Sequence, residues 1–136
     1  MKLLLFYSHS FWIKPYSKTL EEVPDCNEET QSQGVIVAFV HAEEKDEDNL
    51  SKVVTKAIKN IKWLAGKFTT KNVILHSFAH LATSKASPEF AQSVVSKMKD
   101  RLISSGCQVQ ITPFGYFTEF KIHVAGQSLA KVFVEI

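Results

Sequence analysis

Cysteines are few in this sequence, and long apolar runs are absent. Cys26 and Cys107 lie far apart and show no metal-ligand spacing, so we expect two reduced thiols rather than a disulfide. No apolar run approaches the roughly 18 residues that cross a bilayer. The opening run Leu3–Phe6 is too short for a signal peptide, and no small-residue cleavage site follows it. We therefore expect a cytoplasmic protein without a membrane partner.

Arginine is nearly missing as well, and the charge is unevenly distributed. Residues 1–48 hold ten acids against four lysines, a net charge of −6, whereas residues 49–136 hold twelve basic residues against four acids, a net charge of +8. The basic part of the chain suits an RNA partner. Because Arg101 is the only arginine, lysines would supply most of the attraction to a nucleic-acid backbone.

The composition indicates one globular domain over residues 1–136, because 45% of the residues are hydrophobic and 22% are charged. The polar, acid-rich stretch Pro15–Gln33 predicts a long loop. Strand patterns occur at Leu3–Tyr7, Gly34–His41, Val73–Leu75, Gln108–Ile111, Tyr116–Val124 and Val132–Ile136.

An amphipathic helix is predicted over Leu50–Lys67. The acidic run Glu43–Asp48 before it would complement the positive N-terminus of the helix. Trp63 falls on the face opposite the apolar stripe, among lysines. This face is either a solvated lysine surface whose tryptophan is covered by a loop or a partner subunit, or a surface that contacts tRNA. The apolar stripe comprises Val53, Val54, Ala57, Ile58, Ile61, Leu64 and Ala65.

A second helix has clear boundary signals. Ser87 is a suitable N-cap, Pro88 suits the first helical position, and Gly106 follows the last turn. The predicted buried face consists of Phe90, Ala91, Val94, Val95, Met98, Leu102 and Ile103.

Two short motifs, Ser77–Leu81 and Pro113–Phe117, each follow a strand-like run. Segments at strand ends commonly carry ligand-binding residues, so the two motifs together predict a site. His76 and His80 have the four-residue spacing of helical zinc ligands, but they flank a strand end, without a glutamate between them or an obvious third ligand. We therefore expect neither a metal ion nor another cofactor.

Four segments in the same order resemble the N-terminal editing domain of archaeal threonyl-tRNA synthetases, a family related in fold to the D-aminoacyl-tRNA deacylases. They are Lys2–Ser8, Val35–Val40, His76–Thr83 and Thr112–Ile122, and the resemblance covers nearly the whole chain. It implies a single α/β domain with a mixed β-sheet packed by two main helices, in the D-aminoacyl-tRNA deacylase-like arrangement. It also implies hydrolysis of serine wrongly attached to threonine tRNA, without a cofactor.

The resemblance also implies site residues, with departures from the family pattern that include Tyr7–His9 in place of the family's His-Ser-Asp. His80 aligns with the active-site histidine, although it could instead only shape its loop. Thr118 stands where the family has a catalytic lysine, and Lys131 where it has a carboxylate. Lys131 either returns a positive charge to the pocket or is a solvated strand lysine. We take His80, Thr118 and Lys131 as catalytic candidates. The substrate-binding candidates are Ser8, His9, Phe39, Ala42, Glu43, Phe78, Ala79, Gly115, Tyr116 and Phe117.

The resemblance and the departures from its pattern leave three functions open. In the leading one, Phe78, Ala79, Tyr116 and Phe117 exclude the extra methyl group of threonine, and the terminal ribose 2′-hydroxyl helps to activate water. The first alternative is a D-aminoacyl-tRNA deacylase, whose hallmark motifs are not visible here. The second is a non-catalytic module that binds tRNA or dimerises, which the loss of the lysine and the carboxylate would favour.

The expected partners are the 3′ end of threonine tRNA carrying serine and a second copy of the chain. A homodimer is expected because Trp63 lies opposite the core stripe and the apolar C-terminal run offers a strand edge. The catalytic part of a synthetase would be either attached to this domain or separate from it. The sequence leaves open whether the chain is an excised domain or a free-standing relative.

Overall fold

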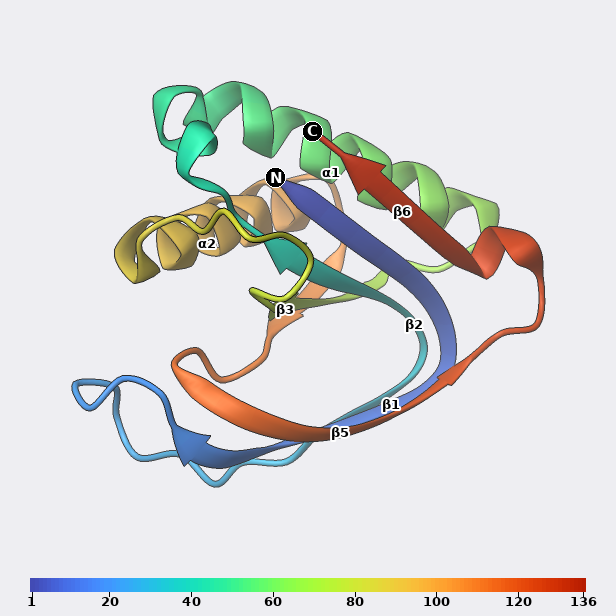
Figure 1. Ribbon diagram of the computed structural model, residues 1–136. Coiled ribbons are helices and arrows are strands. Elements are labelled where there is room, and N and C mark those ends of the chain that lie inside the picture. Colours follow the sequence, from blue (N-terminus) through green and yellow to red (C-terminus); the bar gives the residue numbers. More distant parts are fainter.

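A computed structural model describes all residues, 1–136, as one mixed β-sheet with two long helices on one of its faces (Figure 1). The elements are β1 (Lys2–Lys18), β2 (Thr30–His41), the 3-10 helix η1 (Glu44–Asp48), α1 (Leu50–Lys67), β3 (Asn72–Ser77), α2 (Pro88–Ser104), β4 (Gln108–Ile111), β5 (Tyr116–Val124), the 3-10 helix η2 (Ser128–Ala130) and β6 (Lys131–Glu135).

The strand order is β4-β3-β2-β1-β5, and β6 also pairs with β1. β1 is antiparallel to β2, β5 and β6, whereas β3 is parallel to both β2 and β4. The great length of β1 makes this arrangement possible, because β6 pairs along its segment Lys2–Phe6 and β5 along its segment Ser8–Lys18. The mixed sheet expected from the resemblance is confirmed.

β1 and β2 bend together near Gly34, which has a φ of +59°, a conformation that glycine adopts without steric strain. The pairing of β1 with β5 shifts register at the same level, between Ser8 and Ser10. Beyond the bend, the outer parts of β1 and β2 curl with β5 over the face of the sheet that the helices leave free (Figure 1). The two halves of the sheet therefore enclose a second interior.

The long loop expected over Pro15–Gln33 is wrong, because β1 continues to Lys18 and β2 begins at Thr30. Polar residues around Ser8 interrupt the apolar pattern, but burial at every second residue resumes with Phe11 and Ile13. Pro15 is tolerated because it lies next to the second register shift of the β1–β5 pairing, where the ladder is irregular.

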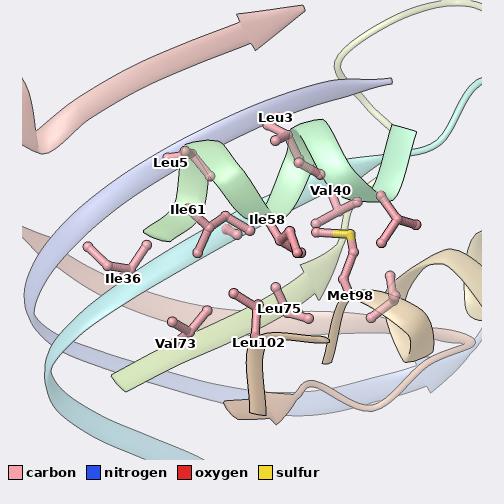
Figure 2. Close-up of a cluster of buried hydrophobic side chains, with 14 of the residues drawn as sticks. Leu3, Leu5, Ile36, Val40, Ile58, Ile61, Val73, Leu75, Met98 and Leu102 are labelled. Atoms are coloured by element: carbon pink, nitrogen blue, oxygen red, sulfur yellow. The ribbon is translucent and has the colours of Figure 1, made fainter. Parts of the chain in front are cut away.

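The main core lies between the sheet and the helices (Figure 2). The predicted apolar stripe of α1 is buried in full, and Leu3, Leu5 and Leu75 pack against it from the strands. In α2, the Ser87 hydroxyl accepts a hydrogen bond from the amide of Phe90, as expected of an N-cap. Ile103 is 48% exposed, so its predicted burial is wrong; one residue beyond the buried Leu102, it has rotated away from the core.

A smaller core lies on the other face of the sheet, inside its curl. Its buried members come from β1, β2 and β3, and Phe78, Phe120 and Ile122 pack against them. The buried residues are Phe11, Ile13, Val35, Val37, Phe39 and Ile74.

The structure refines two expectations about α1. The acidic run precedes α1 as predicted and itself forms η1, where the carboxylate of Asp46 accepts a hydrogen bond from the amino group of Met1 at 2.8 Å. No loop covers Trp63, which is 48% exposed and carries the Lys67 ammonium 5.9 Å from the centre of its ring.

Both cysteines are free thiols, as expected. Neither helix is long and apolar enough to cross a membrane.

Candidate active site

A cavity of about 350 Å³ opens where the curled half of the sheet meets the ends of β3 and α2. The segment His76–His80 lines one side of it, and Pro113–Thr118 lines another. The two segments are at least 33 residues apart in sequence, yet they lie together because β3 pairs with β4, which leads directly into β5. The structure therefore brings them to one site, as the sequence predicts.

The loop between β3 and α2 is held by His41, a buried residue at the end of β2. The amide of Leu81 donates to His41 Nδ1 at 3.0 Å, so that nitrogen carries no proton. Its Nε2 therefore donates to the carbonyl of Ser84, at 2.7 Å. The amide of Ala86 also donates to the carbonyl of Ala42 at 3.1 Å. The His41 imidazole thus fixes the loop that carries His80.

The Gly115 turn is held by the segment between β1 and β2. Gly115 has a φ of +82°, and an added Cβ would lie 2.6 Å from a methyl carbon of Val23. Its carbonyl accepts a hydrogen bond from the amide of Thr19 at 2.8 Å, and the Tyr116 hydroxyl donates to the carbonyl of Pro24. Thr19 and Leu20 also line the cavity, which no local pattern of the sequence indicates.

His76 lies at the floor of the cavity, inside the curl of the sheet. Its ring is 4% exposed and lies 5.2 to 5.9 Å, between centres, from the rings of Phe39, Phe78 and Phe120. Its Nδ1 shares a hydrogen bond of 2.8 Å with the hydroxyl of Thr112. Burial lowers the pKa of His76 from 6.5 to about 4, so the imidazole is neutral at pH 7. The sequence pattern suggests only a metal-ligand spacing for His76 and does not reveal its position at the cavity floor.

The mouth of the cavity carries the groups that can act chemically. His80 is exposed there, with its ring centre 4.9 Å from that of Phe78. The amides of Ala79 and His80 donate no hydrogen bond within the protein and are free to bind a ligand. Lys85 is the only lysine or arginine among the lining residues, and none of the lining residues is acidic. The remaining predicted residues that line the cavity are Ala42, Phe78, Gly115, Tyr116, Phe117 and Thr118.

Lys131 and Glu43 do not line the cavity. The ammonium of Lys131 donates to the carbonyls of Ala125 at 2.9 Å and Gln127 at 3.3 Å, outside this cavity. The carboxylate of Glu43 pairs with the amino groups of Met1 at 3.0 Å and Lys2 at 3.1 Å. Burial alone would raise the pKa of Glu43, but these two cations hold it below its ordinary value.

Three further substrate-binding candidates also lie outside the lining. Ser8 is fully buried in β1, and its hydroxyl has no hydrogen-bond partner. His9 is exposed on the bend of β1, 5.0 Å from the ring of His123. Phe39 lies beneath the cavity and supports His76 and Phe78. The outward position of His9 and the burial of Ser8 follow from the bend, which the sequence pattern does not reveal.

Comparisons with known proteins agree with this architecture. The model of a family described as the archaea-specific editing domain of threonyl-tRNA synthetase matches residues 1–136. Threonine–tRNA ligases of Thermococcus onnurineus and Pyrococcus horikoshii are each 33% identical over 97% of the chain. The chain spans about 22% of their length. A solved structure named c-Myc DNA unwinding element binding protein, 11% identical, superposes with a TM-score of 0.69 over 100% of this chain and 99% of its own. This likeness concerns the fold alone, and it confirms the expected fold class.

Proposed function

Because this chain belongs to the family of archaea-specific editing domains of threonyl-tRNA synthetase, we propose that it hydrolyses the ester that joins serine to threonine tRNA. The observation that carries the proposal is the meeting of the segments His76–His80 and Pro113–Thr118 around one cavity. The cavity lies at strand ends and combines aromatic walls with unpaired backbone amides, which suits a small polar ester. In the cytoplasm, where tRNA is charged, such an activity would correct errors of the synthetase.

Threonine tRNA needs such a correction for a physical reason. A synthetic site built for threonine rejects the smaller serine by only about 1 to 3 kcal/mol, the value of one methyl group. A second site that is too small for threonine supplies the missing discrimination. Phe78 and Tyr116 are bulky lining residues that would contact the extra methyl group, whereas Phe117 is 58% exposed and lies at the mouth.

The chemistry we propose relies on the substrate and on backbone groups. Water attacks the ester carbonyl carbon, the bond to the ribose 3′-oxygen breaks, and a proton passes to that oxygen. The amides of Ala79 and His80 are available to stabilise the oxyanion. The neighbouring ribose 2′-hydroxyl positions the water, because the lining has no carboxylate and His76 is too weak a base at neutral pH. His80 and the Thr118 hydroxyl have supporting roles at the mouth.

We also propose that Lys85, and not Lys131, supplies the positive charge at the site. Lys85 is exposed at the mouth, where the phosphates of the tRNA 3′ end would pass. An exposed ammonium attracts phosphate as a point charge and screens readily with salt. Its contribution would therefore be to tRNA affinity rather than to the chemical step.

The test compares esters on one tRNA. The purified chain is incubated with threonine tRNA carrying L-serine, L-threonine or a D-amino acid, and the rate of release is measured. We expect L-serine to be released at least about 100-fold faster than L-threonine, since the two esters differ in steric fit. Comparable rates for serine and threonine would refute the editing proposal. Release of only the D-amino acid would indicate a D-aminoacyl-tRNA deacylase, and tRNA binding without release a non-catalytic module.

A homodimer is the assembly we propose, formed through β6. This strand pairs only with β1, so its other edge is open, and Phe133 at its centre is 52% exposed. In an antiparallel pairing of two β6 strands centred on Phe133, Lys131 of each copy would lie opposite Glu135 of the other. Light scattering should give a mass near twice 15.3 kDa, and Phe133→Asp should reduce it to the monomer value. A monomer at high concentration of the unmodified chain would refute this arrangement.

A further inference from the structure

The cavity floor holds a hydrogen-bonding atom that the protein leaves free. Nδ1 of His76 is occupied by the Thr112 hydroxyl, but Nε2 has no partner. The Ser8 hydroxyl is the one fully buried side-chain nitrogen or oxygen without a hydrogen-bond partner. Nε2 of His76 is therefore accessible, and because His76 lines the cavity, it is reached from there.

The surroundings of His76 keep this nitrogen neutral. Phenylalanine rings from β2, β5 and the loop after β3 pack around the imidazole, and no acidic side chain lines the cavity to stabilise a charged form. The other ionisable groups of the lining are His80, Lys85 and Tyr116. The Thr112 hydroxyl can either donate to or accept from Nδ1, so Nε2 can accept or donate in turn. Such a nitrogen suits a hydroxyl group, which also does both.

The depth of His76 decides which part of the substrate it can meet. Ala79, His80, Lys85 and Phe117 are exposed, so the nucleotide end of tRNA must approach from that side. His76, at the floor, is only 4% exposed, and aromatic rings surround it. The floor therefore has space only for a small group. The aminoacyl side chain is the part of the substrate that lies beyond the ester, away from the nucleotide, and its hydroxyl is small enough for this space.

We propose that His76 is a specificity-determining residue whose Nε2 binds the side-chain hydroxyl of the aminoacyl group, so that the site selects serine over amino acids without a hydroxyl. The inference rests on the proposed function. A site that hydrogen-bonds a substrate hydroxyl rejects the analogue lacking it, because its own buried polar group then stays unpaired. The alanyl ester fits the same space but leaves Nε2 without a partner.

The experiment measures kcat/KM for threonine tRNA charged with serine or with alanine. We expect the unmodified chain to prefer the seryl ester by about 100-fold. His76→Phe should reduce this preference to about threefold through loss of seryl activity, whereas His76→Gln, which keeps an amide near Nε2, should retain part of it. His123→Phe is the matched control, since His123 is an exposed histidine of β5 outside the cavity.

A second measurement does not depend on the folding of any variant. The ¹⁵N resonance of His76 Nε2 in the unmodified chain is followed while the seryl or alanyl amide of 3′-amino-3′-deoxyadenosine is added. The seryl amide should shift it and the alanyl amide should not. Equal seryl and alanyl rates, or equal shifts with both amides, would overturn the inference while leaving hydrolysis intact. If the unmodified chain releases no serine at all, the proposed function fails and the inference fails with it.

Discussion

Acidification should destabilise this domain through His76 in particular. The pKa of the imidazole is about 4 in the folded chain because of burial, against an ordinary value of 6.5. Between these two pH values the unfolded chain binds a proton that the folded chain does not. The contribution of neutral His76 to stability is therefore complete above pH 6.5 and is lost as the pH falls toward 4.

The magnitude follows from the size of the shift. Each pKa unit corresponds to about 1.4 kcal/mol, so a shift from 6.5 to about 4 amounts to about 3 kcal/mol in full. Of this, about 2 kcal/mol is lost between about pH 7.5 and about pH 5. At the lower of these pH values the imidazole is almost fully protonated in the unfolded chain and mostly neutral in the folded chain. Against a typical total stability of about 5 to 15 kcal/mol, this loss is readily measurable.

The assay is urea unfolding of the unmodified chain and of His76→Gln at about pH 7.5 and about pH 5. The variant cannot titrate at this position but keeps every other ionisable group, including the buried His41. We expect the unmodified chain to lose about 2 kcal/mol more than the variant between the two pH values. If both proteins lose the same stability, His76 does not titrate as its burial requires, and the reasoning is refuted.

The remaining predictions concern the site. Lys131→Ala should leave seryl-ester hydrolysis within about twofold, because its ammonium is engaged by backbone carbonyls away from the cavity, and a large loss would restore it as a catalytic residue. Lys85→Ala should raise KM and weaken its dependence on salt with little change in kcat, unlike the exposed control Lys97→Ala, and unchanged salt dependence would contradict its proposed role. His80→Ala should slow hydrolysis by about 10-fold, whereas tRNA ending in 2′-deoxyadenosine should hardly be cleaved; normal cleavage of that tRNA would disprove assistance by the 2′-hydroxyl. Gly115→Ala should lower the free energy of unfolding by about 1 to 2 kcal/mol because of its positive φ, and unchanged urea unfolding would show that the turn relaxes.

Local patterns were sufficient to predict the helices and the two motifs. The apolar spacing of Leu50–Lys67 identifies the buried face of α1, because helical periodicity depends only on neighbours three and four residues away. The boundaries of α2 follow from Ser87 and Pro88, whose capping effects are equally local. The segments His76–His80 and Pro113–Thr118 could be predicted as a site because each follows a strand and both match one family pattern.

Only the tertiary structure decided which side chains share the cavity. The bend near Gly34 carries Phe120 of β5 over the free face of the sheet, and this enclosure lowers the pKa of His76. It also leaves Ser8 buried, and Lys131 occupied by backbone carbonyls outside the cavity. Burial, desolvation and ion pairing depend on atoms that are distant in sequence. The residue types and their local periodicity therefore determined the helices and the family, whereas tertiary pairing determined the length of β1 and β2, and the curl of the sheet determined the polarity, depth and charge of the cavity.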